Sequence, residues 1–109
     1  MIDPLLSRYQ WYFRHSDDDH DVLDIGDRSI ACTNVRRALP MLDVEVVAEL
    51  SAENLYDQSL KDAVKAFQTK YRHRVADGLV GPGTRALLVS ELFHRYPVQI
   101  FARLKRPEM

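Results

Sequence analysis

The run of residues 60–71 constrains the fold more than any other part of the sequence. Its apolar residues recur at the spacing of one helix face: Leu60, Ala63, Val64, Phe67 and Tyr71. Charged residues fill most of the positions between them, so the run has one apolar face and one charged face. We expect an amphipathic helix here, with Asp57 or Ser59 as its N-cap and Phe67 at the centre of the core.

A second helix is predicted to begin within the stretch DGLVGPGTRALL at residues 77–88. Three of the four glycines of the chain lie in this stretch, and glycine tolerates the positive φ that a tight turn requires. We expect Gly78 or Gly81 at positive φ. Proline has the φ of a first helical turn, so the helix is expected to begin near Pro82 and to end before Pro97.

Two further helices are predicted nearer the N-terminus. Apolar spacing predicts a helix over residues 33–42, in which Pro40 removes a backbone hydrogen bond and should shorten or kink the helix. Residues at helical spacing also occur earlier, at Leu5, Leu6, Tyr9, Tyr12 and Phe13. The polar run HSDDDHD at residues 15–21 follows them and is predicted to be a loop. The chain is therefore expected to be all-α.

The composition fits one small globular domain, because 46% of the residues are hydrophobic, 28% are charged and the net charge is -1. The single cysteine, Cys32, excludes an internal disulfide and is expected to be a small buried hydrophobe. Residues 1–20 contain no basic leader followed by an apolar core, and no later stretch is long enough to cross a bilayer. We expect synthesis in the cytoplasm without a Sec signal peptide, and action there or in the envelope by a non-Sec route.

No constellation of catalytic residues is evident. The four histidines share no metal-ligand spacing, and no GxSxG elbow frames a nucleophile. The run DDDHD has the alternating aspartates of a calcium loop but lacks its glycine and its closing glutamate, which favours a solvated acidic loop. Basic residues are scattered rather than arranged as a stripe, so no nucleic acid partner is expected. The sequence therefore predicts no enzyme, no metal site and no cofactor.

A weak internal repeat relates the two helices first described. LYDQSLKDAV, which starts at Leu55, aligns without gaps with LVGPGTRALL, which starts at Leu79. Each copy consists of two apolar residues, a turn and a helix. Two copies are too few for a solenoid, so we expect two similar loop–helix units that pack together.

Three segments together resemble a known family. VRRALPML, LYDQSLKDAVKAFQ and VADGLVGPGTRALL resemble, in order, the three segments of the peptidoglycan-binding-like domain family, a three-helix module found attached to cell-wall hydrolases. The resemblance covers roughly residues 26–93, and AVKAFQ and DGLVGPGT are its most specific parts. The first loop departs from the family pattern, since Asp57 replaces a glycine and Leu60 replaces a threonine.

The resemblance implies a three-helix core at residues 26–96, an N-terminal helix and acidic loop at 1–25 and a C-terminal extension at 97–109. It implies non-catalytic binding of bacterial peptidoglycan, accessory to a wall hydrolase or an envelope-spanning system. Glycan or stem peptide is expected in a groove between the two loop–helix units. The residues expected to bind it are Tyr56, Tyr71, Thr84 and Arg85. Gln68 and Asp77 are expected to close loop backbone through hydrogen bonds, beside Gly78, Gly81 and Pro82.

The alternative is a protein-interaction or adaptor module of a secretion or phage assembly that keeps the fold without wall binding. In an α-helix Trp11 lies about 200° around the axis from Tyr9, so at least one N-terminal aromatic residue should be exposed. Trp11 is therefore a candidate for docking a protein partner. We expect that deleting residues 1–21 leaves a folded core that retains any peptidoglycan binding but loses association with a protein partner or with itself.

Overall fold

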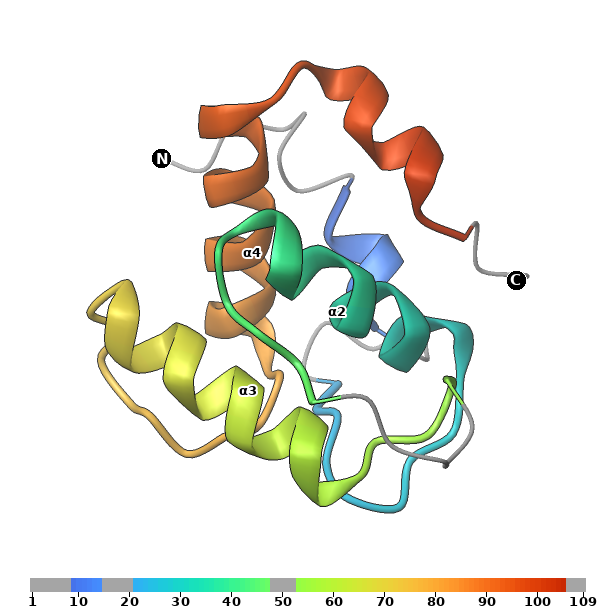
Figure 1. Cartoon of the computed structure of the whole chain (residues 1–109), viewed down its shortest axis with the longest axis vertical. Coiled ribbons are helices and arrows are strands. Elements are labelled where there is room, and N and C mark those ends of the chain that lie inside the picture. Colours follow the sequence, from blue (N-terminus) through green and yellow to red (C-terminus); the bar gives the residue numbers. More distant parts are fainter. Residues whose placement is uncertain (1–8, 15–20, 48–52, 106–109) are drawn as a thin grey trace.

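The computed structural model describes residues 9–14, 21–47 and 53–105. The elements of this part are the 3-10 helix η1 (Gln10–Phe13), the helices α2 (Ile30–Met41), α3 (Gln58–Lys70) and α4 (Pro82–Arg95), and the 3-10 helix η2 (Val98–Arg103) (Figure 1). Extended pairing among the described residues is limited to two isolated β-bridges, so the fold is all-α as predicted. The predicted N-terminal helix is represented here by η1, whereas Leu5 and Leu6 lie outside the described residues.

Helices α3 and α4 begin where local chemistry favours a helix start. Asp57 Oδ1 accepts a hydrogen bond from the Leu60 amide at 2.8 Å, so Asp57 rather than Ser59 is the side-chain N-cap of α3. Helix α4 begins at Pro82, and Gly81 occupies its N-cap position without a side-chain hydrogen bond. It ends at Arg95, before Pro97.

Helix α2 differs from its prediction at both ends. It starts at Ile30, three residues earlier than expected, because the buried residues Ala31 and Cys32 extend its apolar face. Pro40 is the second-last residue of the helix, where the Leu42 amide already closes a tighter turn by donating to Leu39 O at 2.9 Å. The helix ends one residue after Pro40, whose ring lacks the backbone hydrogen bond to Arg36.

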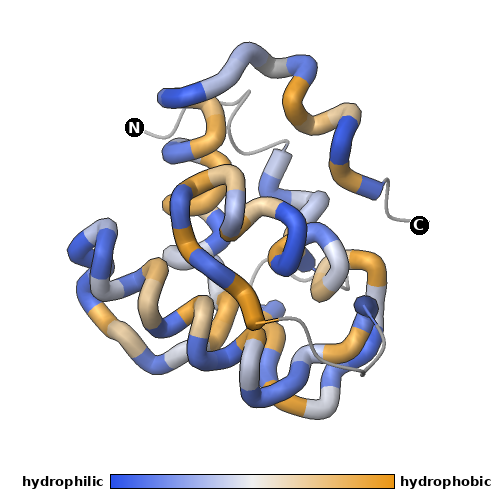
Figure 2. Tube along the Cα trace, in the orientation of Figure 1, coloured by the Kyte–Doolittle hydropathy of each residue, from blue (hydrophilic) through white to orange (hydrophobic). Residues whose placement is uncertain are grey.

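The apolar faces of the helices meet in one core around α2, which contacts α3, α4 and η1. Hydrophobic and hydrophilic residues alternate along the helices, as Figure 2 shows. Phe67 has no exposed surface. Cys32 is fully buried as well, and burial raises the pKa of its thiol.

The core extends into both flanking segments. Buried hydrophobic residues outside 26–96 are Tyr12, Phe13, Leu23, Ile100, Phe101 and Leu104. Phe13 has no exposed surface, so removing residues 1–21 would take a core side chain with them. The expectation that this segment can be removed without consequence for the core does not fit the packing.

Asn34 of α2 holds the two flanking segments together. Its buried side-chain amide donates to Tyr12 O at 2.9 Å and to Lys105 O at 2.7 Å, while Oδ1 accepts from the Lys105 amide at 2.7 Å. A buried amide requires such partners. One side chain thus fixes η1 and the residues after η2 against α2.

Aromatic rings pack where these segments meet the end of α4. The ring centroids of Tyr9 and Phe101 are 4.5 Å apart, and those of Tyr9 and Phe93 are 5.3 Å apart. Tyr12 is buried, and Tyr9 and Trp11 are half-buried. The expectation that at least one of these aromatic residues is exposed is wrong for residues 9–13, because this segment packs against α2 and α4. A docking role for Trp11 stays a prediction.

Candidate functional site

The two loop–helix units, residues 55–70 and 79–95, bind the same stretch of chain. This bridging segment, residues 21–29, pairs with Val80 of the second unit through Leu23, by hydrogen bonds of 3.0 and 3.1 Å. It pairs with Tyr56 of the first unit through Gly26 and Asp27, at 3.0 and 2.8 Å. Tyr56 and Val80 are equivalent positions of the repeat. The groove expected between the units is therefore occupied by residues 21–29.

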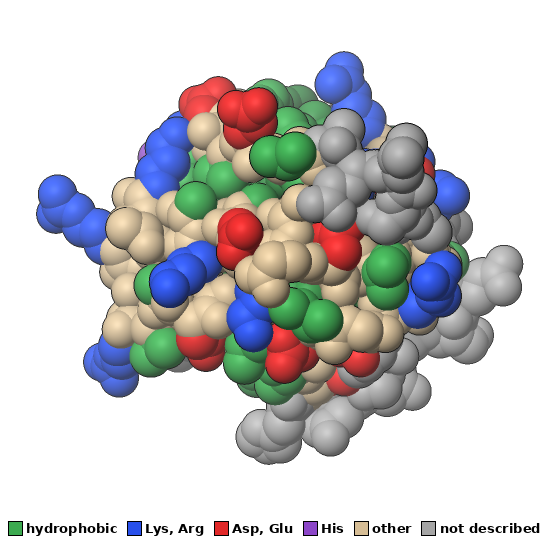
Figure 3. Space-filling model, turned by 60° about the horizontal axis from the view of Figure 1, so that its bottom comes forward, with side chains coloured by type: hydrophobic (Ala, Val, Ile, Leu, Met, Phe, Trp, Pro, Cys, Tyr) green, Lys and Arg blue, Asp and Glu red, His purple; other side chains and the backbone are tan. Residues whose placement is uncertain are grey.

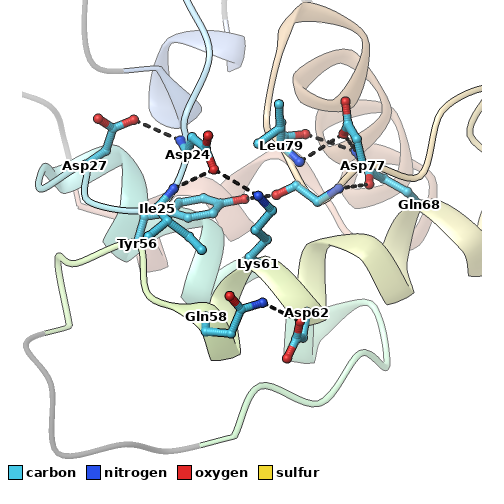
Figure 4. Close-up of polar contacts among 11 residues, drawn as sticks. Asp24, Ile25, Asp27, Tyr56, Gln58, Lys61, Asp62, Gln68, Asp77 and Leu79 are labelled. Atoms are coloured by element: carbon cyan, nitrogen blue, oxygen red, sulfur yellow. Dashed lines mark hydrogen bonds and ion pairs between the residues drawn. The ribbon is translucent and has the colours of Figure 1, made fainter.

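Tyr56 is consequently buried rather than exposed. Its side chain has no accessible surface, and its hydroxyl donates to Gly78 O at 2.6 Å. Figure 4 shows the ring lying between the bridging segment and the loop that precedes α4. Burial raises the pKa of the Tyr56 phenol well above its ordinary value. Tyr56 joins the two loops and presents no surface to a ligand.

The other three residues expected to bind ligand are also engaged within the fold. Thr84 and Arg85 are 3% and 1% exposed, so their expected exposure is wrong. Arg85 donates to the backbone oxygen of Asp21 in the bridging segment. Tyr71 is half-buried, and its hydroxyl donates to Leu42 O at 3.0 Å.

Gln68 organises the loop before α4. Its buried side chain donates through Nε2 to Leu79 O at 3.0 Å and to Thr84 Oγ1 at 2.9 Å, and accepts through Oε1 from the Gly78 amide at 2.8 Å. Asp77 Oδ1 accepts from the Leu79 amide at 3.0 Å. These contacts, several of which Figure 4 shows, connect α3 to residues 77–84 and fix the shape of the loop.

Gly78 allows this loop to approach α3. Its φ is +78°, whereas Gly81 has φ −95°. A Cβ at position 78 would lie 2.7 Å from Cγ of Lys61 and 3.0 Å from its backbone oxygen. Lys61 in turn forms an ion pair with Asp24 of the bridging segment at 3.3 Å. Only glycine fits here without displacing α3 or the bridging segment.

An open pocket of about 170 Å³ lies beside this loop. Its walls come from the bridging segment, the turn after α3 and the first turn of α4. The lining residues are Val22, His73, Asp77, Leu79, Gly81, Pro82, Gly83 and Thr84. We call it the His73 pocket. The side chains with ionisable groups among these are His73 and Asp77.

The ring of His73 has a defined position in this pocket. Nδ1 lies 2.9 Å from Val75 O and 3.2 Å from the Val75 amide nitrogen, so the backbone of its own turn holds the ring. A Cβ at Gly83 would lie 3.1 Å from Nε2, which places the ring against the first turn of α4. No described residue binds Nε2. This nitrogen is therefore available to a ligand.

The charges around the pocket are of both signs. Arg72 and Arg74 flank His73 in the sequence, and both are exposed. Asp77 is exposed as well, and its hydrogen bonds to Leu79 and Gln68 both use Oδ1.

Sequence reasoning missed His73 as a site residue. The available signal was Gly83. A glycine in the first turn of a helix destabilises that helix, so its presence indicates that a neighbouring side chain occupies the space of a Cβ.

Other kinds of site find less support in the described part of the chain. No group of three His, Cys, Asp or Glu side chains there is placed to hold a metal ion, and Asp17 and Asp19 lie outside it. None of the helices described is both long and apolar enough to cross a membrane. On the face in Figure 3, hydrophobic side chains form small patches between charged ones.

Comparison with known proteins gives a family match that includes every residue lining the pocket except Val22. Residues 43–88 match a family model described as "Putative peptidoglycan binding domain". Over 78 residues the chain is 42% identical to N-acetylmuramoyl-L-alanine amidase CwlM of Mycobacterium tuberculosis. This alignment covers 64% of the present chain and 19% of the amidase, so the chain corresponds to a small part of that protein. No solved structure matches the chain significantly.

Proposed function

We propose that this chain binds bacterial cell-wall peptidoglycan without cleaving it, because residues 43–88 match the family model of a putative peptidoglycan-binding domain. One observation carries the proposal. The His73 pocket is open to solvent, and all of its lining residues except Val22 lie within the family match. Concave sites with a few fixed polar groups are where small ligands bind.

The chemistry of the pocket favours binding over cleavage. Hydrolysis of an amide or glycosidic bond needs an activated nucleophile, a paired acid and base, or a metal-bound water. The hydroxyl of Thr84 is buried and bonded to Gln68, and the lining contains no serine or cysteine. The relative is named as an amidase, and its alignment covers 19% of it. We propose that the present domain is accessory to such a hydrolase or to an envelope-spanning system.

The test is co-sedimentation of the full chain with purified sacculi. We expect the protein to pellet with sacculi, and His73→Ala to lower the bound fraction several-fold, because Nε2 is the free polar atom of the ring. His94→Ala is the matched control, since His94 is exposed on α4 and does not line the pocket. A wild-type chain that stays in the supernatant at all protein concentrations would reject the proposal.

An adaptor module that keeps the fold without wall binding is the alternative, and the first loop favours it. There Arg36 of α2 donates to Leu55 O at 2.8 Å and pairs with Asp57 at 3.2 Å, so polar contacts close the loop where the family pattern has a glycine. The comparisons lend no support to a secretion or phage assembly. Absence of sacculus binding together with self-association in light scattering would favour this alternative.

A further inference from the structure

We infer that the His73 pocket binds the peptide part of peptidoglycan, at a position carrying both a carboxylate and an ammonium group, and that it does not bind the glycan strand. This inference rests on the proposed function. It follows from three properties of the pocket: the absence of a Phe, Tyr or Trp wall, the presence of one carboxylate and one imidazole, and the small apolar volume beside them.

The first property concerns stacking. Sugar rings present faces of C–H bonds, which bind best to a flat aromatic ring. The lining of the His73 pocket contains no Phe, Tyr or Trp. The aromatic side chains of the described residues are buried or half-buried, and most of them pack in or against the core. A glycan strand would therefore find no aromatic platform in the pocket.

The second property is charge. Asp77 places a carboxylate in the pocket, while His73 offers Nε2 and has an exposed arginine on either side of it in sequence. Hydrogen bonds to ionised groups are roughly twice as strong as those between neutral groups. A glycan strand stripped of its peptides carries lactyl carboxylates but no amine, whereas a stem peptide carries carboxylates and, where it contains a diamino acid, a free amine as well. Arg72 and Arg74 do not line the pocket, so its polar groups are the Asp77 carboxylate, which can pair with the amine of the peptide, and Nε2 of His73, which can form a hydrogen bond with its carboxylate.

The third property is size. The apolar walls come from Val22, Leu79 and Pro82, which suit a methyl-bearing residue such as alanine. The volume of about 170 Å³ is below the range of about 300 Å³ or more that drug-sized ligands occupy. One or two peptide residues match this space better than a disaccharide does.

The experiment compares two soluble preparations by NMR titration of the full chain. One is a purified stem tetrapeptide that contains a diamino acid, and the other is glycan strands from which an amidase has removed the peptides. We expect the peptide to shift the amide resonances of His73, Asp77 and Gly83, and the stripped glycan to leave them unchanged. Acetylation of the peptide amine should weaken binding several-fold, and so should raising the salt concentration.

Three variants test the position of the site. Asp77→Asn keeps the Oδ1 acceptor but removes the charge, and His73→Ala removes the ring; each should weaken peptide binding several-fold. Gly83→Ala should weaken it too by displacing the ring, with melting unchanged or raised because alanine favours a helix. The controls Asp62→Asn and His94→Ala, both exposed and outside the pocket, should bind as the wild type does.

The outcomes separate the inference from the proposed function. If intact sacculi are not bound, the proposed function fails. If sacculi are bound but stripped glycan competes as well as the peptide, the inference is overturned while the function stands. If the peptide binds but the pocket variants bind it equally well, the site is elsewhere and the inference is also overturned.

Discussion

The two loop–helix units share a backbone plan and differ in how each loop is closed. In both, the second apolar residue, Tyr56 or Val80, is buried and hydrogen-bonded to the bridging segment. In the first unit Asp57 caps α3 and pairs with Arg36. In the second unit Gly81 provides no side-chain cap, and the His73 pocket opens there. Polar side chains thus close the loop of the first unit, whereas the loop of the second unit borders an open pocket.

The units also converge at their C-terminal ends. Tyr71 and Arg95 occupy equivalent positions of the repeat and meet at the turn after α2. Tyr71 donates to Leu42 O at 3.0 Å, and Arg95 pairs with Asp43 at 2.6 Å and donates to the Tyr71 hydroxyl at 3.0 Å. The shared plan therefore includes the C-terminal ends of both units, whereas the beginnings of the helices differ.

The largest expected effect compares Phe67, on the apolar face of α3, with Glu91 at the equivalent position of α4. Phe67→Ala should lower the free energy of unfolding by about 3 to 5 kcal/mol, because it leaves a cavity in the core. The equivalent residue, Glu91, is only half-buried, so Glu91→Ala should change it by about 0.5 kcal/mol or less. Urea unfolding followed by circular dichroism measures both, and similar losses in the two variants would contradict this comparison.

The next effect compares Gly78 with Gly81, two glycines of the loop before α4. Gly78→Ala should cost about 1 to 3 kcal/mol, since alanine would be strained at φ +78° and would collide with Lys61. Gly81→Ser should raise stability by a few tenths of a kcal/mol, because serine is a better N-cap than glycine and its Cβ has normal contacts. Thermal melting of both variants tests this. Equal destabilisation would show that both glycines serve the turn.

A smaller effect concerns Asp57, the side-chain N-cap of α3, which has no counterpart in the second unit. Asp57→Ala should cost about 1 kcal/mol through the loss of the hydrogen bond to the Leu60 amide. Asp57→Asn keeps a capping oxygen and loses the charge that faces Arg36, so it should cost less. If asparagine proves as damaging as alanine, the ion pair and not the cap closes the first loop. Unfolding in urea at neutral pH distinguishes the two.

The smallest effect is the pH dependence of the pair between Arg95 and Asp43. The hydrogen bond from Arg95 holds the pKa of Asp43 below its ordinary value. A lowered carboxyl pKa adds stability above the unfolded value of about 3.9, and that stability is lost as pH falls through the folded value. Arg95→Met should therefore melt slightly below the wild type at pH 7 and converge with it below about pH 4. Parallel melting curves from pH 7 to 2.5 would contradict this.

The sequence predicted what depends on local patterns. The apolar spacing in α3, Pro82 at the start of α4 and the repeat itself are all encoded within a few turns of chain. The bounds of α3 and α4 accordingly agree with the prediction to within two residues.

The site was not predictable in the same way. Tyr56 and Arg85 looked accessible because nothing local indicates that residues 21–29 bind them. That binding depends on single β-bridges between distant residues, such as Leu23 with Val80, which leave no periodic signal. His73 became a site residue only when the turn after α3 placed its ring against Gly83.

Asn34 has a consequence for the order in which the chain assembles. Its bonds to Lys105 join residues 71 positions apart, whereas the contacts within each helix are local. Closing a long loop lowers the entropy of the chain, and this cost is offset only by contacts that form once the loop has closed. We therefore expect the closure at Asn34 to form late in folding and to open first in the native state. Hydrogen exchange at the Lys105 amide would then report on this local opening, well before the amides around Phe67 exchange.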